Sequence, residues 1–302
     1  MPTGVPIEFQ AVTKRFGQVN AVTDLSFAVE PGRVTGFLGP NGAGKTTTLR
    51  MLLGLVAPTS GSATIGGVPY RTLERPLATV GAALEAASFH PGRSARDHLR
   101  VHAQAARIPA GRVGAVLETV GLAAYADRRV GGYSLGMRQR LGLAHALLGD
   151  PGVLVLDEPI NGLDPEGIKW IRTFLRALAA EGRTVLVSSH LLSEVQQTVD
   201  EVVIIAKGRL VHRGTLADLE TGSATKVVVD SPDREALAAA LQASGLPFDH
   251  GRNGLVVSAD DTAQVGHIAF AAGVEVSALF RQRAASGLED SFLALVGEEG
   301  SL

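Results

Sequence analysis

Residues 39–47 read Gly-Pro-Asn-Gly-Ala-Gly-Lys-Thr-Thr, and this stretch decides the fold. Before it, Val34–Leu38 is a short β-branched and aromatic run that predicts a buried strand. After it, Leu49, Leu52 and Leu53 recur at helical spacing. A strand, a glycine-rich loop and a helix, in this order, are the context in which the pattern G-x-x-x-x-G-K-[ST] forms a phosphate-binding loop.

The residue types in this loop suit a nucleoside triphosphate. Glycines let the backbone turn with its N–H groups facing inward, and the positive end of the following helix dipole attracts phosphate oxygens. Lys45 adds a full positive charge for the β- and γ-phosphates, and the Thr46 hydroxyl is expected to ligate Mg²⁺. We therefore expect ATP and Mg²⁺ to bind here. The expected nucleotide-contacting residues of the loop are Gly39, Pro40, Asn41, Gly42, Ala43, Gly44, Lys45, Thr46 and Thr47.

Composition excludes several other classes of protein. The 28 Lys and Arg residues nearly balance 30 Asp and Glu, so no overall basic field indicates nucleic acid. The absence of cysteine excludes disulfides, thiolate nucleophiles and cysteine zinc sites. Residues 1–10 lack a signal-peptide pattern, and prolines and glycines interrupt the uncharged stretch 51–70. We expect a soluble chain, for which a transport role requires another polypeptide.

Strand and helix patterns alternate around the loop, which predicts an α/β core with a parallel sheet. Ile7–Val12 and Ala21–Val29 alternate like strands of an antiparallel sheet. The apolar runs Val153–Leu156 and Thr184–Ser188 suit central parallel strands that are covered on both faces. Helical patterns cover residues 93–127, 134–148 and 168–180, and further strand patterns cover 201–206 and 209–213.

The pattern changes after Leu219, and residues 220–224 have the composition of a linker. The sequence therefore predicts two domains, residues 1–219 and residues 225–302. The second is expected to be a small accessory or regulatory α+β domain without a second phosphate loop. Three roles stay open for it: regulation of hydrolysis, stabilisation of the dimer and binding of the membrane subunit. Its expected strands are 226–230, 254–258 and 274–280, and its expected helices are 234–244, 262–272 and 288–296.

Catalytic side chains are expected where two central strands end. Asp157 and Glu158 follow one strand, where Asp157 suits Mg²⁺ and Glu158 suits a general base that polarises water. His190 follows the next strand, so its imidazole is expected at the same sheet edge, against the γ-phosphate or Glu158.

Two aromatic features have more modest interpretations. His98 and His102 are four residues apart, but without a third ligand we interpret them as a solvated helix face and not as a metal site. Phe16 lies between two expected strands, where it either stacks on an adenine ring or makes a small core contact.

The order of these motifs resembles the nucleotide-binding subunits of ATP-binding cassette (ABC) transporters, over residues 5 to about 220. The motifs are the 39–47 loop, Tyr133–Arg140, Leu156–Pro159, Asn161–Pro165 and Ser189-His190. The resemblance implies an antiparallel β subdomain, a parallel-sheet core and a helical subdomain. It also implies that two chains, identical or closely related, sandwich two ATP molecules.

The resemblance implies roles for individual residues. Ser134 and Gly136 match the signature that opens a helix toward the γ-phosphate of ATP on the other subunit. Asp164 matches the residue that crosses the dimer interface. His190 matches the switch histidine, Lys45 the phosphate-binding lysine and Phe16 the aromatic residue that stacks on adenine.

Two departures resemble bacitracin- and lantibiotic-resistance exporters. The signature reads Tyr-Ser-Leu-Gly-Met instead of Leu-Ser-Gly-Gly-Gln, and Glu85 stands where the family has a glutamine that contacts Mg²⁺. A carboxylate there is a better Mg²⁺ ligand but repels the γ-phosphate.

We thus expect an ATP-hydrolysing subunit on the cytoplasmic face of the membrane, bound to a transmembrane permease near residues 85–100. The expected cargo is an antimicrobial peptide or drug, and nucleic acid is not expected as a partner. The alternative is a soluble ABC-type ATPase that acts on nucleic acid or ribosomes, although such proteins usually carry paired nucleotide domains, long coiled coils or zinc cysteines. A P-loop GTPase or small-molecule kinase is disfavoured, because the guanine motif Asn-Lys-x-Asp does not occur.

Overall fold

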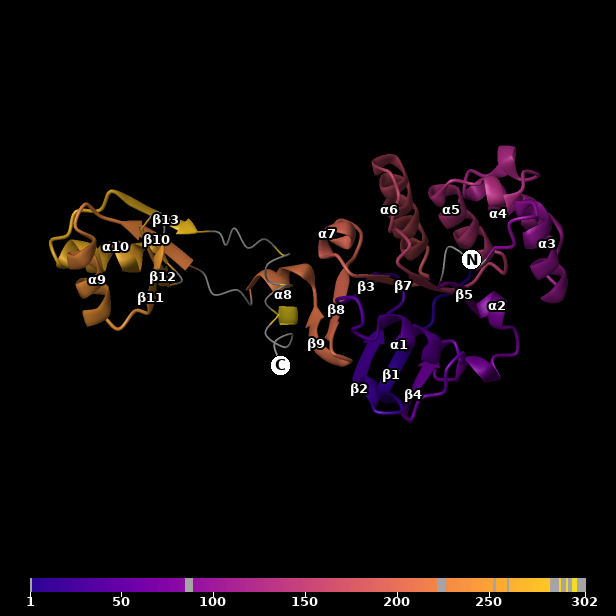
Figure 1. Ribbon diagram of the computed structural model, residues 1–302, viewed down its shortest axis with the longest axis horizontal. Helices are drawn as coiled ribbons and strands as arrows, with labels where there is room; N and C mark the ends of the chain where they lie inside the picture. Colours follow the sequence, from indigo (N-terminus) through magenta and orange to yellow (C-terminus); the bar gives the residue numbers. More distant parts are fainter. Residues whose placement is uncertain are drawn as a thin grey trace. The chain divides into compact units, whose positions relative to one another are not determined.

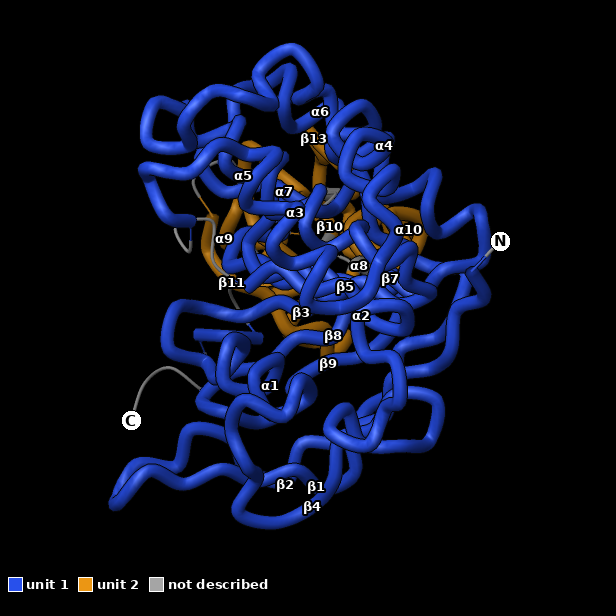
Figure 2. The backbone as a smooth tube through the Cα atoms, turned by 90° about the vertical axis from the view of Figure 1, so that its right-hand side faces the viewer, with its two compact units in different colours: residues 1–215, 295–302 blue, residues 216–294 orange. Residues whose placement is uncertain are grey.

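The structure, a computed structural model, describes residues 2–84, 89–221, 226–251, 254–259, 261–282, 288, 292 and 295–297. The chain divides into two compact units, residues 1–215 with 295–302 and residues 216–294, which Figure 2 colours separately. The domain boundary predicted after Leu219 falls inside helix α8 (Leu216–Thr221) of the second unit. Among the described residues, no helix has both the length and the apolar character that a membrane span requires.

A six-stranded sheet, in the order β5-β6-β7-β3-β8-β9, forms the centre of the first unit. All its neighbouring strands run parallel except β9, which pairs antiparallel with β8. Helices α5 and α6 cover one face, and α1 with a second sheet covers the other (Figure 1). This double cover explains why the inner strands β6, β7 and β3 are buried along almost their whole length. The strands are β3 (Val34–Leu38), β5 (Val80–Ala83), β6 (Val153–Asp157), β7 (Thr184–Ser189), β8 (Glu201–Ala206) and β9 (Arg209–Gly214).

The second sheet is antiparallel, in the order β2-β1-β4. Its strands are β1 (Ile7–Phe16), β2 (Val19–Val29) and β4 (Ser60–Ile65), so β1 extends to Phe16, which the sequence placed in a loop. The rings of Phe9 and Phe27 stack at 4.4 Å between centroids, and Phe27 stacks on Phe37 of β3 at 5.3 Å. This stack joins the two sheets beside α1 (Lys45–Leu52), whose Leu49 is fully buried in the same core.

The helical part contains α3 (Ala95–Ala105), α4 (Gly111–Thr119) and α5 (Leu135–Ala146). The prediction of continuous helix over 93–127 is wrong. The chain breaks between α3 and α4, where Arg107 has a left-handed φ of 55° and Pro109 follows. Further α-helices among the described residues of this unit include α2 (Pro76–Thr79), α6 (Pro165–Ala180) and α7 (Leu192–Val195).

The interpretation of His98 and His102 as a solvated face is also wrong. His98 is only 8% exposed, and its ring lies 4.7 Å from that of His102 between centroids. The ring of His145 on α5 lies 4.4 Å from that of His102. Because α3 packs on α5, the face that carries these histidines points into the protein.

The second unit has its own sheet and core. Its described strands run antiparallel in the order β11-β12-β10-β13, and helices α9 and α10 pack on the face that presents Val227, Val229, Leu255 and Val257. The chain order βαββαβ with this strand order is a split βαβ arrangement. The elements are β10 (Lys226–Asp230), α9 (Arg234–Ala243), β11 (Phe248–Gly251), β12 (Gly254–Ser258), α10 (Thr262–Ala271) and β13 (Ala278–Gln282).

Candidate functional site

The phosphate loop joins β3 to α1 and is shaped by close neighbours. Gly44 caps α1 with φ 101°, and a Cβ on it would lie 2.5 Å from the carbonyl oxygen of Ala21. A Cβ on Gly39 would lie 2.3 Å from the carbonyl oxygen of Ile205. The first N–H groups of an α-helix have no acceptor within the helix, so the start of α1 offers donors to an anion. Pro40, Asn41, Gly42, Ala43 and Thr47 belong to the same loop and helix start.

Lys45 lies over this loop and reaches the catalytic edge. Its side chain is nearly buried, and Nζ donates a hydrogen bond to the carbonyl oxygen of Gly39 at 2.6 Å. Nζ also lies 3.5 Å from Oε1 of Glu158. Burial lowers the pKa of Lys45, while the carboxylate of Glu158 opposes that shift. The ammonium group thus bridges the predicted phosphate loop and the predicted base.

Asp157 ends β6 beside the loop. Its Oδ2 accepts a hydrogen bond of 2.7 Å from the Thr46 hydroxyl, and its Oδ1 accepts one from the Ser188 hydroxyl. The parallel pairing of Asp157 with Ser188 of β7 places these groups side by side. Hydroxyl and carboxylate oxygens are the donors that Mg²⁺ prefers, so Thr46 and Asp157 fit the predicted metal site.

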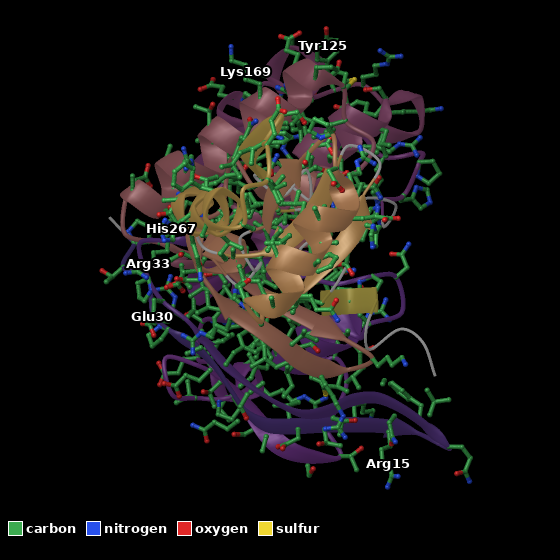
Figure 3. All side chains as sticks on the ribbon, turned by 90° about the vertical axis from the view of Figure 1, so that its left-hand side faces the viewer. Arg15, Glu30, Arg33, Tyr125, Lys169 and His267 are labelled. Atoms are coloured by element: carbon green, nitrogen blue, oxygen red, sulfur yellow. The ribbon has the colours of Figure 1, made fainter. Side chains whose placement is uncertain are left out.

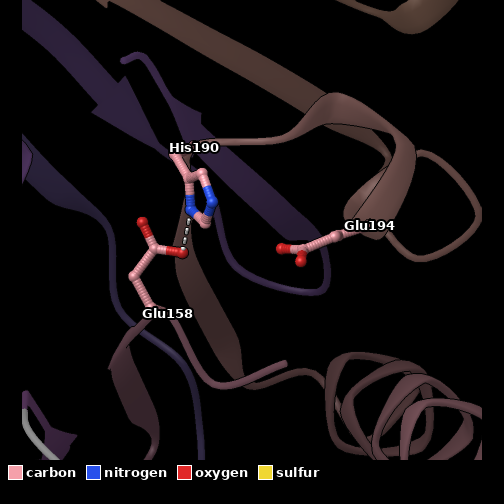
Figure 4. A group of neighbouring side chains, drawn as sticks. All are labelled: Glu158, His190 and Glu194. Carbon is pink, nitrogen blue, oxygen red and sulfur yellow. Dashed lines mark hydrogen bonds and ion pairs between the residues drawn. The ribbon is translucent and has the colours of Figure 1, made fainter. Parts of the chain in front are cut away.

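Glu158 and His190 form a hydrogen-bonded pair at the same edge. Oε2 of Glu158 lies 2.9 Å from Nδ1 of His190 (Figure 4). The backbone of Glu158 has a left-handed φ of 50°, which is uncommon for a residue with a side chain and is often found at functional sites. Its N–H donates to the Ser188 hydroxyl at 3.0 Å, which secures this turn.

Ser188 is a residue of this candidate site that the sequence reasoning missed. One hydroxyl contacts the Asp157 carboxylate and the Glu158 backbone, so it orients both predicted catalytic carboxylates. The sequence did contain a signal for it. Ser188 stands near the end of the strand that precedes His190, and parallel pairing places it beside Asp157 at the end of β6.

A second carboxylate, Glu194, approaches the Glu158–His190 pair. One ligand atom from each of these three residues lies within 4.8 Å of those of the other two. Glu194 belongs to α7, and its carboxylate faces the imidazole on the side opposite Glu158 (Figure 4). Oε2 of Glu158 is paired with Nδ1 of His190, and Oε2 of Glu194 accepts a hydrogen bond from the Ser189 hydroxyl at 2.9 Å. The arrangement is therefore that of a hydrogen-bonded acid–base group.

Other predicted residues lie outside this assembly. Ser134 caps α5 by accepting a hydrogen bond from the Met137 N–H at 3.2 Å, and Gly136 lies in its first turn. Asp164 caps α6 in the same way, with the Gly167 N–H at 2.9 Å. Within the described part of the chain, no hydrogen bond or ion pair joins Ser134, Gly136 or Asp164 to the phosphate loop.

Phe16 is half exposed near the tip of the β1–β2 hairpin, next to Arg15, which Figure 3 labels. The Nζ atom of Lys14 lies 4.8 Å from the centroid of the Phe16 ring. The ring is thus accessible for stacking, and its adenine role stays a prediction. Glu85, the remaining predicted metal ligand, lies outside the described residues.

Models of known protein families match part of each unit. Residues 22–161 match the model described as ABC transporter, and residues 225–286 match a domain of unknown function. The bacitracin transport ATP-binding protein BcrA of Bacillus licheniformis is 46% identical over 67% of this chain and 67% of that protein. BcrA of Enterococcus faecalis is 35% identical over 97% of each chain, and the Nod factor export ATP-binding protein I of Paraburkholderia xenovorans is 36% identical over 97% of each.

Solved structures share the fold of the first unit. The ATP-binding subunit of an ABC transporter aligns with a TM-score of 0.65 and 26% identity, over 72% of this chain and 92% of that one. A dimeric ATP-binding cassette in a post-hydrolysis state, bound to ADP and Pi, aligns with a TM-score of 0.63 and 21% identity, over 69% and 98%. The family match includes the phosphate loop, Ser134, Asp157 and Glu158.

Proposed function

Because the chain belongs to the ATP-binding subunits of ABC transporters, a family of ATPases, we propose that it powers a separate membrane permease that exports an antimicrobial peptide or drug. The observation that carries the catalytic part is the assembly of Lys45, Asp157, Glu158 and His190 at one sheet edge. It brings together the residues predicted to act as phosphate-binding cation, metal-binding carboxylate and base.

We assign each of these residues a role in hydrolysis. Lys45 exchanges its bond to the Gly39 carbonyl for a phosphate oxygen of ATP. Glu158 takes a proton from water while the water oxygen bonds to the γ-phosphorus. The bond between the γ-phosphorus and the oxygen that bridges it to the β-phosphate breaks, and that oxygen leaves with ADP. His190 holds Glu158 through Nδ1. Thr46 and Asp157 would hold Mg²⁺, which neutralises phosphate charge when bound.

The N-terminus of α5 supports a dimer as the working unit. This 12-residue helix has Ser134 as its N-cap and Gly136 in its first turn. Its exposed end presents backbone donors and the positive end of the helix dipole. Leu135 is 49% exposed beside them. We propose that this surface meets the ATP held by the second subunit, with Asp164 close to the interface and Phe16 against the adenine.

A cavity of about 340 Å³ supports the permease contact near residues 85–100. Arg50, Leu55 and residues of β5, α3 and α5 contribute to its lining. The lining includes Phe89 and three histidines, so it offers both apolar surface and hydrogen-bonding groups. A permease segment in this cavity would hold the chain at the cytoplasmic face of the membrane.

The cargo is proposed from the relatives. Two of them are named for bacitracin transport and one for Nod factor export, which supports a role in export. Of these, bacitracin is a peptide antibiotic, and the departures at Leu135 and Glu85 favour that branch. Export of an antimicrobial peptide is therefore the function that we put forward.

Affinity capture of the tagged chain from detergent-solubilised membranes of its host tests the permease. We expect a multi-span protein to co-purify at comparable stoichiometry.

A resistance assay tests the cargo. Deleting the gene is expected to sensitise the host to bacitracin. Wild type and Glu118→Ala, an exposed control on α4, should restore resistance. Glu158→Gln should not, because loss of the base lowers kcat by roughly 10²- to 10⁴-fold. In the capture experiment, recovery of the tagged chain only with ribosomal or DNA-bound proteins would contradict the transporter role.

A further inference from the structure

His190 lies between two carboxylates that have different origins. Glu158 follows β6 and contacts Nδ1 of the imidazole at 2.9 Å. Glu194 lies on α7, four residues after His190, and approaches the opposite side of the ring (Figure 4). The ligand atoms of all three residues lie within 4.8 Å of one another, and the Glu158 and His190 side chains are 23% and 26% exposed. At such short range and partial burial, the charge of Glu194 acts on the imidazole with limited screening.

The Glu194 carboxylate is held in this position. The Ser189 hydroxyl donates to Oε2 of Glu194 at 2.9 Å, and Ser189 itself is 1% exposed. The Leu191 N–H donates to the same hydroxyl at 3.1 Å. Arg172 on α6 donates to the backbone carbonyl of Glu194 at 3.1 Å, which holds the backbone of this residue in place. The carboxylate is thus anchored by the residue that directly precedes His190.

An imidazole is oriented through both of its nitrogen atoms. A partner at one nitrogen fixes the ring rotation and the tautomer, and therefore what the other nitrogen presents. Glu158 occupies the Nδ1 side of the ring, and Glu194 faces the opposite side. Nothing in the hydrolysis scheme uses Glu194.

We propose that Glu194 is a positioning residue for hydrolysis: its anchored carboxylate holds the His190 ring with Nδ1 against Glu158. The inference rests on the proposed roles of Glu158 and His190. Removing Glu194 leaves the ring free to rotate away from Glu158, so the base is oriented for a smaller fraction of the time. The effect falls on kcat, since Glu194 is not expected to contact the nucleotide.

The test measures kcat and KM for Mg-ATP with the purified full-length chain. Glu194→Ala is expected to lower kcat about 5- to 20-fold and to change KM less than 2-fold, whereas the conservative Glu194→Gln keeps an acceptor oxygen and retains more activity. Ser189→Ala, which frees the carboxylate, should lower kcat in the same direction but less. Glu118→Ala serves as the control and should match wild type. Circular dichroism melting confirms that each variant folds.

A double-mutant cycle separates positioning from a purely structural effect. In a His190→Ala background, Glu194→Ala should lower the single-turnover rate no further, because its action passes through the imidazole. Equal losses in both backgrounds, or a Glu194→Ala variant with wild-type kcat, would overturn the proposal while leaving the role of His190 intact. A His190→Ala variant with wild-type activity would overturn both.

Discussion

At the residue scale, the catalytic edge depends on side chains that serve two groups at once. Lys45 contacts both the phosphate loop and Glu158, and Ser188 contacts both Asp157 and Glu158. Such shared contacts tie Asp157, the proposed metal ligand, to Glu158, the proposed base, so displacement of one is expected to move the other. Ser188 has no expected contact with ATP, yet both carboxylates rely on it.

Ser188→Ala is therefore expected to lower kcat about 10- to 100-fold, since hydrogen bonds to charged groups contribute roughly 1.5–3 kcal/mol. It should also raise the Mg²⁺ concentration that gives half-maximal rate, because Asp157 loses an orienting donor. ATPase assays over a Mg²⁺ titration measure both effects, with the exposed Ser62→Ala as control. Unchanged rate and Mg²⁺ dependence in Ser188→Ala would show that this hydroxyl orients neither carboxylate.

At the element scale, sequence reasoning succeeds where the pattern is local. The phosphate loop with its strand and helix was predicted because glycines and apolar spacing specify it within one short stretch of sequence. Asp157 and His190 were placed together because parallel strands end at one edge. Strand β4 was missed, since Ser60–Ile65 is poor in large apolar residues and is a strand because it pairs with β1. The buried face of α3 was also missed, since only packing on α5 reveals it.

That buried face predicts a loss of stability in acid. Burial, together with the neighbouring His102, lowers the pKa of His98 and His145 to about 4, against 6.5 in an unfolded chain. Between these values the unfolded state binds more protons. Stability therefore falls as pH drops from 6.5 to 4, by about 1.4 kcal/mol per pH unit for each extra proton.

Urea unfolding at pH 7.5, 6 and 5, followed through Trp170 of α6, measures this slope. His145→Gln should reduce the acid loss relative to wild type, and the exposed His90→Gln should not. Identical slopes in all three proteins would mean that acidic side chains, and not these imidazoles, determine the acid sensitivity.

At the scale of the whole molecule, the described residues of one chain supply only part of the expected nucleotide site. Lys45, Thr46, Asp157, Glu158 and His190 converge, whereas Ser134 and Gly136 start a different helix and share no hydrogen bond or ion pair with them within the described part of the chain. An exposed helix N-terminus attracts phosphate but has none to meet within its own chain. The simplest completion is a second chain that brings its phosphate to this helix.

Glu158→Gln should therefore form an ATP-dependent dimer, because it binds nucleotide without hydrolysing it. Size-exclusion chromatography with light scattering should give about twice the chain mass of 31.4 kDa with Mg-ATP and the single mass with ADP. Adding Ser134→Glu should abolish the dimer: a carboxylate at a helix N-terminus favours the helix but repels the γ-phosphate of the partner's ATP. Ser62→Glu on β4 controls for charge alone. If the Ser134→Glu protein still dimerises with ATP, the start of α5 does not face the nucleotide, and the interface must lie on another surface.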